Sequence, residues 1–122
     1  MKIEYTLTAE QDYIPVRGNA MASGDAAFDR ACEDRIIEYL ESGDIWAWAA
    51  VTVTAKVIGE NGEEFKGRAV LGGCSYENEE DFRAPGGYFE DLKKEAADDL
   101  RGDLEHYVRS GNAAAKLLSG EN

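Results

Sequence analysis

The stretch IWAWAAVTVTAKVI, residues 45–58, most constrains the fold, because every odd-numbered position in it is apolar. Strict alternation over this length is typical of a β-strand that buries one face. The turn-forming sequence GENGEE follows, so the chain is expected to reverse there and return as a second strand over residues 65–71. The odd-numbered apolar positions are Ile45, Ala47, Ala49, Val51, Val53, Ala55 and Val57.

The length of the turn sets which residues of the two strands face each other. A two-residue turn at Asn61 and Gly62 would place Lys66 and Arg68 on the apolar face, which is unfavourable. A three-residue loop over 60–62, with Gly62 in the left-handed conformation, avoids this. We therefore predict the pairs that follow from the longer loop: Val57 with Phe65, Ala55 with Gly67, Val53 with Ala69, and Val51 with Leu71.

The remaining elements complete an α+β fold. Alternation over residues 2–8 predicts a first strand, and the aperiodic segment 9–24 a long loop. Apolar spacing of three and four residues predicts helices over 25–42, capped by Ser23 or Asp25 and ended by Gly43, and over 88–109, ended by Gly111. Between residues 72 and 87 we expect a loop with one helical turn that begins at Asn78 and holds Phe82 inward.

The order β-α-β-β-α predicts a three-stranded antiparallel sheet with the two main helices packed on one face. The chain of 122 residues fits a single domain, 1–122, in which 112–122 forms a short C-terminal helix or a frayed tail. If the odd-numbered face lies under the helices, Trp46 and Trp48 lie together on the opposite face. Each indole can bury ~200 Å², so both need a cover. The long loop over residues 9–24 is the first candidate for that cover, and a second copy of the protein, as a homodimer, or another partner is the alternative.

The formal net charge is −12, and the excess acids are concentrated in segments 25–44 and 77–105. Such a field repels phosphate groups, which disfavours direct nucleic-acid binding and attachment to an anionic membrane, and it favours a basic partner. The sequence contains no run of about 20 apolar residues and begins without an apolar leader, so we expect a cytoplasmic protein.

Catalytic signals are weak. His106 stands alone near the end of the last helix, and nothing marks a base beside Cys74 or Ser75. The acidic run that begins at Glu77 lacks the spacing of a calcium loop. We therefore expect no enzyme activity, no cofactor and no metal.

Three segments carry a resemblance that spans most of residues 16–92: VRGNAMASGD, GDIWAWAAVTVTA and LGGCSYENEEDFRAPGGYFEDL. They resemble a family of small acidic proteins, of uncharacterised activity, encoded by bacteriophages and prophages. The resemblance implies the cytoplasm of an infected bacterial host. By analogy, it implies inhibition of host defence, as in anti-CRISPR and anti-restriction proteins that present carboxylates in place of DNA phosphates.

The function expected from these observations is a non-enzymatic anti-CRISPR-like inhibitor that binds a basic groove of a host defence protein or nucleoprotein complex. Phe82 or Tyr88 would supply an apolar anchor, whereas Trp46 and Trp48 would serve self-association. Two alternatives stay open. One is a protein that sequesters a nucleotide signal by stacking on the Trp pair, with Arg17 or Arg68 at the phosphate. The other is a phage accessory protein whose acidity only confers solubility. The predicted partner-binding carboxylates are Glu33, Asp34, Glu38, Glu41, Glu79, Glu80, Asp81, Asp91, Glu95, Asp98 and Asp99.

Overall fold

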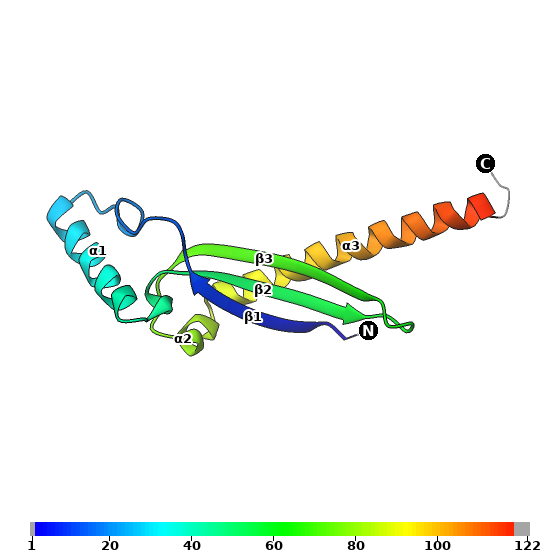
Figure 1. The fold of residues 1–122 in the computed structure, drawn as a ribbon, viewed down its shortest axis with the longest axis horizontal. Helices are drawn as coiled ribbons and strands as arrows, with labels where there is room; N and C mark the ends of the chain where they lie inside the picture. Colours follow the sequence, from blue (N-terminus) through cyan, green and yellow to red (C-terminus); the bar gives the residue numbers. More distant parts are fainter. Residues whose placement is uncertain (1, 119–122) are drawn as a thin grey trace.

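The computed structural model describes residues 2–118 and confirms the predicted α+β class (Figure 1). A three-stranded antiparallel sheet has the order β1-β2-β3, and the longest helix, α3, packs on it. A short 3-10 helix, η1, precedes β2. The elements are β1 (Glu4–Gln11), α1 (Ala26–Glu41), η1 (Ile45–Ala47), β2 (Ala49–Ile58), β3 (Glu64–Cys74), α2 (Glu79–Arg83) and α3 (Tyr88–Leu118).

The predicted register of the β2–β3 hairpin is confirmed at all four pairs, including Val57 opposite Phe65 and Ala55 opposite Gly67. The loop closes through two backbone hydrogen bonds, from Gly59 N–H to the Glu63 carbonyl at 2.7 Å and from Gly62 N–H to the Gly59 carbonyl at 3.0 Å. Gly62 has φ +86°, the left-handed conformation that the three-residue loop requires. The need to keep Lys66 and Arg68 off the apolar face therefore correctly selects the turn.

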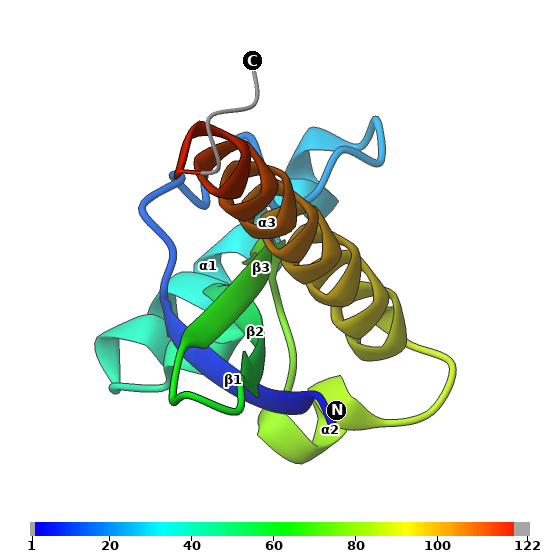
Figure 2. The same cartoon turned by 90° about the vertical axis from the view of Figure 1, so that its right-hand side faces the viewer.

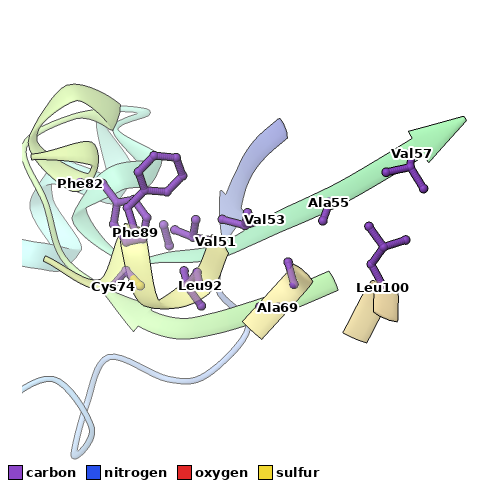
Figure 3. Close-up of a cluster of buried hydrophobic side chains, with 12 residues drawn as sticks. Val51, Val53, Ala55, Val57, Ala69, Cys74, Phe82, Phe89, Leu92 and Leu100 are labelled. Carbon is purple, nitrogen blue, oxygen red and sulfur yellow. The ribbon is translucent and has the colours of Figure 1, made fainter. Parts of the chain in front are cut away.

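The core lies between the odd-numbered face of β2 and one side of α3 (Figure 3). Val51, Val53 and Ala55 have no solvent exposure, and α3 contributes Phe89, Leu92, Ala96 and Leu100 to the same cluster. The helix approaches β3 so closely that a Cβ built on Gly67 would lie 2.2 Å from the Ala96 carbonyl oxygen and from the Leu100 nitrogen. Gly67 is thus the residue that allows α3 to rest on the sheet.

Helix α3 runs to Leu118, so the prediction that Gly111 ends it is wrong. Gly111 is not among the glycines with positive φ, and the helix passes through it. One helical glycine costs about 1 kcal/mol relative to alanine, and the alanine-, lysine- and leucine-rich residues that follow are strong helix formers. The predicted tail therefore continues the helix as far as residue 118, and residues 119–122 lie outside the described part.

Helix α1 begins and ends as predicted. The Asp25 carboxylate accepts hydrogen bonds from the N–H groups of Ala27 and Phe28, and Gly43, with φ +95°, follows the last turn. Its position differs from the expected one, because α1 contacts mainly η1 and lies beyond the end of the sheet, whereas α3 lies along the sheet (Figures 1 and 2). The two helices therefore do not share one sheet face.

The start of β2 explains the positions of the tryptophans. Asp44 caps η1 by accepting a hydrogen bond from Trp46 N–H, and the 3-10 turn interrupts the strand alternation until Ala49. The prediction that Trp46 and Trp48 lie together on the outer face is consequently wrong. Trp46 packs against the core, 5.7 Å from the Phe82 ring. Trp48 is buried, and its Nε1–H donates to the Ile14 carbonyl at 2.7 Å, so the long loop covers it as first expected.

Candidate partner-binding surface

The acidic residues of α1 are partly committed to contacts within the protein. Glu33 is only 8% exposed, and its carboxylate accepts hydrogen bonds from Gly18 N–H at 2.8 Å and from Arg17 Nη1 at 3.3 Å. Asp29 similarly accepts from the Ser23 hydroxyl at 2.6 Å. These bonds attach the loop between β1 and α1 to the helix. Glu33, a predicted partner-binding residue, is therefore placed where it holds the loop.

Arg17 also pairs with Asp34, the next predicted residue. Hydrogen bonding to Asp34, and secondarily to Glu33, raises the pKa of Arg17, so the guanidinium stays charged throughout the accessible pH range. Arg17 is thereby occupied by α1 carboxylates, which leaves it poorly placed to bind a phosphate group. The predicted α1 residues that remain exposed, without an ion pair to any described side chain, are Glu38 and Glu41.

The acids of the short helix α2 likewise divide into those with contacts inside the protein and one that is exposed. Glu79 pairs with Arg83 at 3.1 Å, and the Asp81 carboxylate accepts from Glu77 N–H at 3.2 Å. Glu80 is exposed and has no such contact among the described residues. The predicted inward position of Phe82 is confirmed, because it is 1% exposed.

Burial decides between the two proposed apolar anchors. Phe82 lies at the centre of an aromatic cluster, 5.0 Å from the Tyr76 ring and 6.4 Å from the Phe89 ring, so it cannot contact a partner and its assignment as an anchor is wrong. Tyr88 is 58% exposed at the start of α3. It is the anchor that the fold leaves available.

The outer side of helix α3 carries more acids than bases, with exposed Lys94 and Arg101 among its carboxylates. Asp91, Glu95 and Asp98 are exposed and lie three or four residues apart, on the side of the helix opposite Leu100. Exposed Glu105 lies on the same side, seven residues or two helical turns beyond Asp98, and the sequence prediction did not include it although the helical periodicity marks it. We call these four residues the α3 acidic face. Asp98 pairs with Arg101 at 2.6 Å, whereas the other three have no ion pair among the described side chains.

Asp99 has a different role. Its carboxylate accepts a hydrogen bond at 2.8 Å from the N–H of Arg68, on strand β3. A strand at the edge of a sheet exposes unpaired backbone groups, and this contact satisfies one of them. Asp99 therefore fixes α3 to the sheet and is not part of the α3 acidic face.

One cleft lies between α1 and the segment that joins β3 to α2, with a volume of about 430 Å³. Arg35 and Tyr39 from α1 face Ser75 and Tyr76 across it. Burial raises the pKa of the Tyr76 phenol, which stays protonated at neutral pH. The two aromatic rings suit a planar molecule, whereas the carboxylates of Asp44 and Glu77 in the same lining oppose the attraction of Arg35 for an anion.

Nucleophilic chemistry has little support next to that cleft. Burial raises the pKa of the Cys74 thiol to about 11, with the Asp12 carboxylate as a second cause, so the sulfur is protonated at neutral pH. Across residues 2–118, no three His, Cys, Asp or Glu side chains converge as a metal site would require. In the same range, every helix is too short or too polar to span a bilayer.

Comparisons with known protein families, with curated proteins and with solved structures find no match to this chain.

Proposed function

We propose that this protein is a non-enzymatic inhibitor of a host defence complex, which uses the α3 acidic face to occupy a Lys- and Arg-lined groove that normally binds nucleic acid. The observation that carries the proposal is the exposure of this face on a helix whose opposite side is fixed to the sheet by Leu92, Ala96 and Leu100. Because the helix backbone is already ordered, binding has to restrict only the side chains of this face. The resemblance to phage-encoded proteins supplies the biological setting.

The spacing of the carboxylates suits a partner whose surface normally binds phosphate groups. Side chains three or four residues apart on a helix are ~5–6 Å apart, so successive carboxylates can meet successive Lys and Arg side chains. From Asp91 to Glu105 the helix rises about 21 Å. Glu80 on α2 lies close in sequence to the start of this face, while Glu38 and Glu41 lie on α1 beyond the end of the sheet (Figure 1). The α3 acidic face is therefore the principal contact, and α1 is a separate one.

Charge alone gives limited affinity. An exposed ion pair contributes ~0.2–1 kcal/mol, so a specific complex needs several pairs together with an apolar contact. Tyr88, at the N-terminal end of the same helix, provides an aromatic side chain for that contact. We expect the complex to combine salt-sensitive pairing along α3 with burial of the Tyr88 ring.

The test uses affinity capture from a bacterial host lysate with the whole protein as bait, followed by measurement of the isolated complex. The variant Asp91→Lys, Glu95→Lys, Glu105→Lys reverses three carboxylates and leaves Asp98 and Asp99 in their internal contacts. Affinity should fall by at least about tenfold in the variant, and similarly in wild type between 0.1 and 0.5 M salt. Double-stranded DNA should compete with the inhibitor for the captured partner.

A matched control makes the same charge change elsewhere. Glu4→Lys, Glu10→Lys, Glu60→Lys reverses three exposed acids on β1 and the hairpin turn, so its net charge equals that of the α3 variant. The proposal requires that this control retain most of the affinity. Equal losses in both variants would show that only total charge matters, and binding that survives salt and the α3 reversal would refute the electrostatic mechanism.

A second candidate function, sequestration of a small nucleotide-like ligand, is favoured only by the cleft beside Tyr39 and Tyr76. The Trp pair cannot supply the stacking surface, because Trp48 is covered by the loop and Trp46 packs against Phe82. Arg35 would then meet the phosphate. Calorimetric titration with cyclic and linear nucleotides, repeated with Arg35→Ala, tests this function, and the absence of heat in wild type counts against it.

A further inference from the structure

The C-terminal part of α3 extends past the sheet that supports the rest of the helix. Figure 1 shows α3 rising away from the strands toward its C-terminal end. Its last ring contact with the sheet is between Tyr107 and Phe65, whose centroids are 4.9 Å apart. Helix continues from there to Leu118, a rise of about 16 Å. Helices of this length are marginal in water unless they pack against something.

The face of α3 that packs on the sheet remains apolar beyond it. Leu104 is half-buried, and Val108, on the same side, is 56% exposed. A shallow, almost wholly apolar groove runs along Leu104 and Val108, with Glu105 and Arg109 at its margin. The same spacing continues along the helix to Gly111, three residues after Val108. This is the heptad spacing of a helix that packs against one other helix.

The distribution of charge indicates which molecule can pack against this apolar seam, which consists of Leu104, Val108 and Gly111. The whole chain carries −12, so two copies repel each other over most of their surfaces. Residues 104–118 contain one acid, Glu105, and two bases, Arg109 and Lys116, so this segment carries no excess of negative charge. It is the part of α3 on which a second copy can approach without strong repulsion, and an antiparallel arrangement keeps the two acidic bodies at opposite ends.

We propose that residues 104–118 of α3 pair with the same segment of a second copy as an antiparallel two-helix coiled coil. The dimer contact is separate from most of the surface proposed for the defence partner, because the apolar groove continues the sheet-packing side of α3, and Glu105 is the one residue of the α3 acidic face that borders it. Gly111, near the middle of the overlap, lets the two helix backbones approach closely. Self-association, which the sequence analysis assigned to Trp46 and Trp48, is thus assigned to the C-terminal part of α3.

Salt separates this proposal from the proposed function. The apolar seam is insensitive to salt, while screening weakens the repulsion between the acidic bodies, so dimerisation should become tighter as salt rises. Binding of a basic partner should become weaker over the same range. Sedimentation equilibrium of the whole protein at about 0.05 and 0.5 M salt measures dimerisation. The affinity of the captured complex at the same salt concentrations measures binding of the basic partner. A dimer that dissociates with added salt would overturn the coiled-coil proposal and leave the proposed function intact.

Val108→Glu places a charge in the seam and should raise the dimer dissociation constant by at least about tenfold. Val70→Glu is the matched control, because Val70 is 62% exposed on β3 and lies outside the seam. Val108→Ala, which favours helix but removes apolar surface, should weaken the dimer by a smaller factor and shows that unfolding is not the cause. Wild-type protein that stays monomeric at millimolar concentration in both salts, or equal effects of the two Glu variants, would overturn the proposal.

Discussion

The two acidic helices use their carboxylates in different ways. On α1, Asp25 caps the helix, and Asp29, Glu33 and Asp34 hold the preceding loop. On α3, Asp91, Glu95 and Glu105 face solvent without an ion pair among the described side chains, and only Asp99 contacts the backbone of the sheet. The acids in the first half of α1 therefore hold the loop in place, while Glu38 and Glu41 farther along stay exposed, and most acids on α3 form an exposed surface.

The difference follows from what each helix packs against. Helix α3 lies on an apolar sheet face, so hydrophobic burial and the close approach at Gly67 hold it in place and its outer side is left free. Helix α1 lies beyond the end of the sheet, and Glu33 is its one buried residue. A helix with so little buried apolar surface depends on polar contacts for its position.

Gly67→Ala tests the attachment of α3 and should have the largest effect. The added methyl would lie 2.2 Å from backbone atoms of Ala96 and Leu100, which cannot move aside as a flexible side chain would. We expect a loss of about 3 kcal/mol in the free energy of unfolding. Urea denaturation followed by tryptophan fluorescence measures it.

Gly102→Ala is the control on α3, because nothing lies within 4 Å of the Cβ that it adds. It should stabilise the protein by up to about 1 kcal/mol, since alanine favours helix. If both alanine variants unfold at the same urea concentration, close backbone contact does not hold α3 on the sheet.

Glu33→Ala tests the structural role of α1 carboxylates and should rank second. It removes the acceptor of the Gly18 N–H and one partner of Arg17 in a half-buried setting. A loss of about 2 kcal/mol is expected, because a shielded backbone donor is left unpaired. Thermal unfolding measured by circular dichroism gives the value, and faster amide exchange at Gly18 would show where the loss arises.

Glu95→Ala removes a carboxylate from the α3 acidic face, and its unfolding free energy should stay within about 0.5 kcal/mol of wild type. The comparison between the two helices fails if Glu95→Ala destabilises the protein as much as Glu33→Ala does.

Asp99→Ala tests the α3 carboxylate that contacts the sheet instead of facing solvent. The variant loses the hydrogen bond to Arg68 N–H and should cost about 1 kcal/mol, while the neighbouring Asp98→Ala loses only an exposed pair with Arg101. Urea denaturation of both variants separates them. An Asp98→Ala effect as large as that of Asp99→Ala would mean that the edge contact on β3 contributes nothing specific.

The sequence predicts those parts of the fold in which one local pattern has a single low-energy solution. The hairpin register follows from keeping Lys66 and Arg68 off an apolar face, and the α1 caps follow from Asp25 and Gly43. The 3-10 turn at Ile45–Ala47 is less predictable, because Ile45 and Ala47 fit the alternation of the following strand. That turn, fixed by Asp44, separates Trp46, which packs against Phe82, from Trp48, which the long loop covers.

The sequence predicts which acids belong to the candidate site, but it does not predict which of them make contacts within the protein. Helical periodicity identifies Asp91, Glu95 and Asp98, and it also marks Glu105. Periodicity does not show that Glu33 reaches Gly18, because that contact joins a helix to an aperiodic loop. It does not distinguish Asp98 from Asp99 either, since their different roles depend on which of them faces the edge of β3.

Asp12 gives the smallest expected effect and concerns the other end of the loop that α1 holds. Hydrogen bonds from the backbone N–H groups of Ile14, at 3.1 Å, and Gly73, at 2.6 Å, lower the pKa of Asp12 in the folded protein. A carboxyl group with a lowered folded pKa stabilises the protein above its unfolded pKa of about 3.9, and this contribution disappears as the pH falls through the folded value. The stability gap between wild type and Asp12→Asn should therefore be present at pH 6 and shrink by about pH 2. Unfolding free energies at both pH values measure it, with Asp91→Asn as the control that removes a carboxylate without such backbone bonds. A gap of equal size at both pH values would mean that the charge of Asp12 does not fasten the loop, which would leave the α1 contacts of Glu33 and Asp34 as its principal attachment.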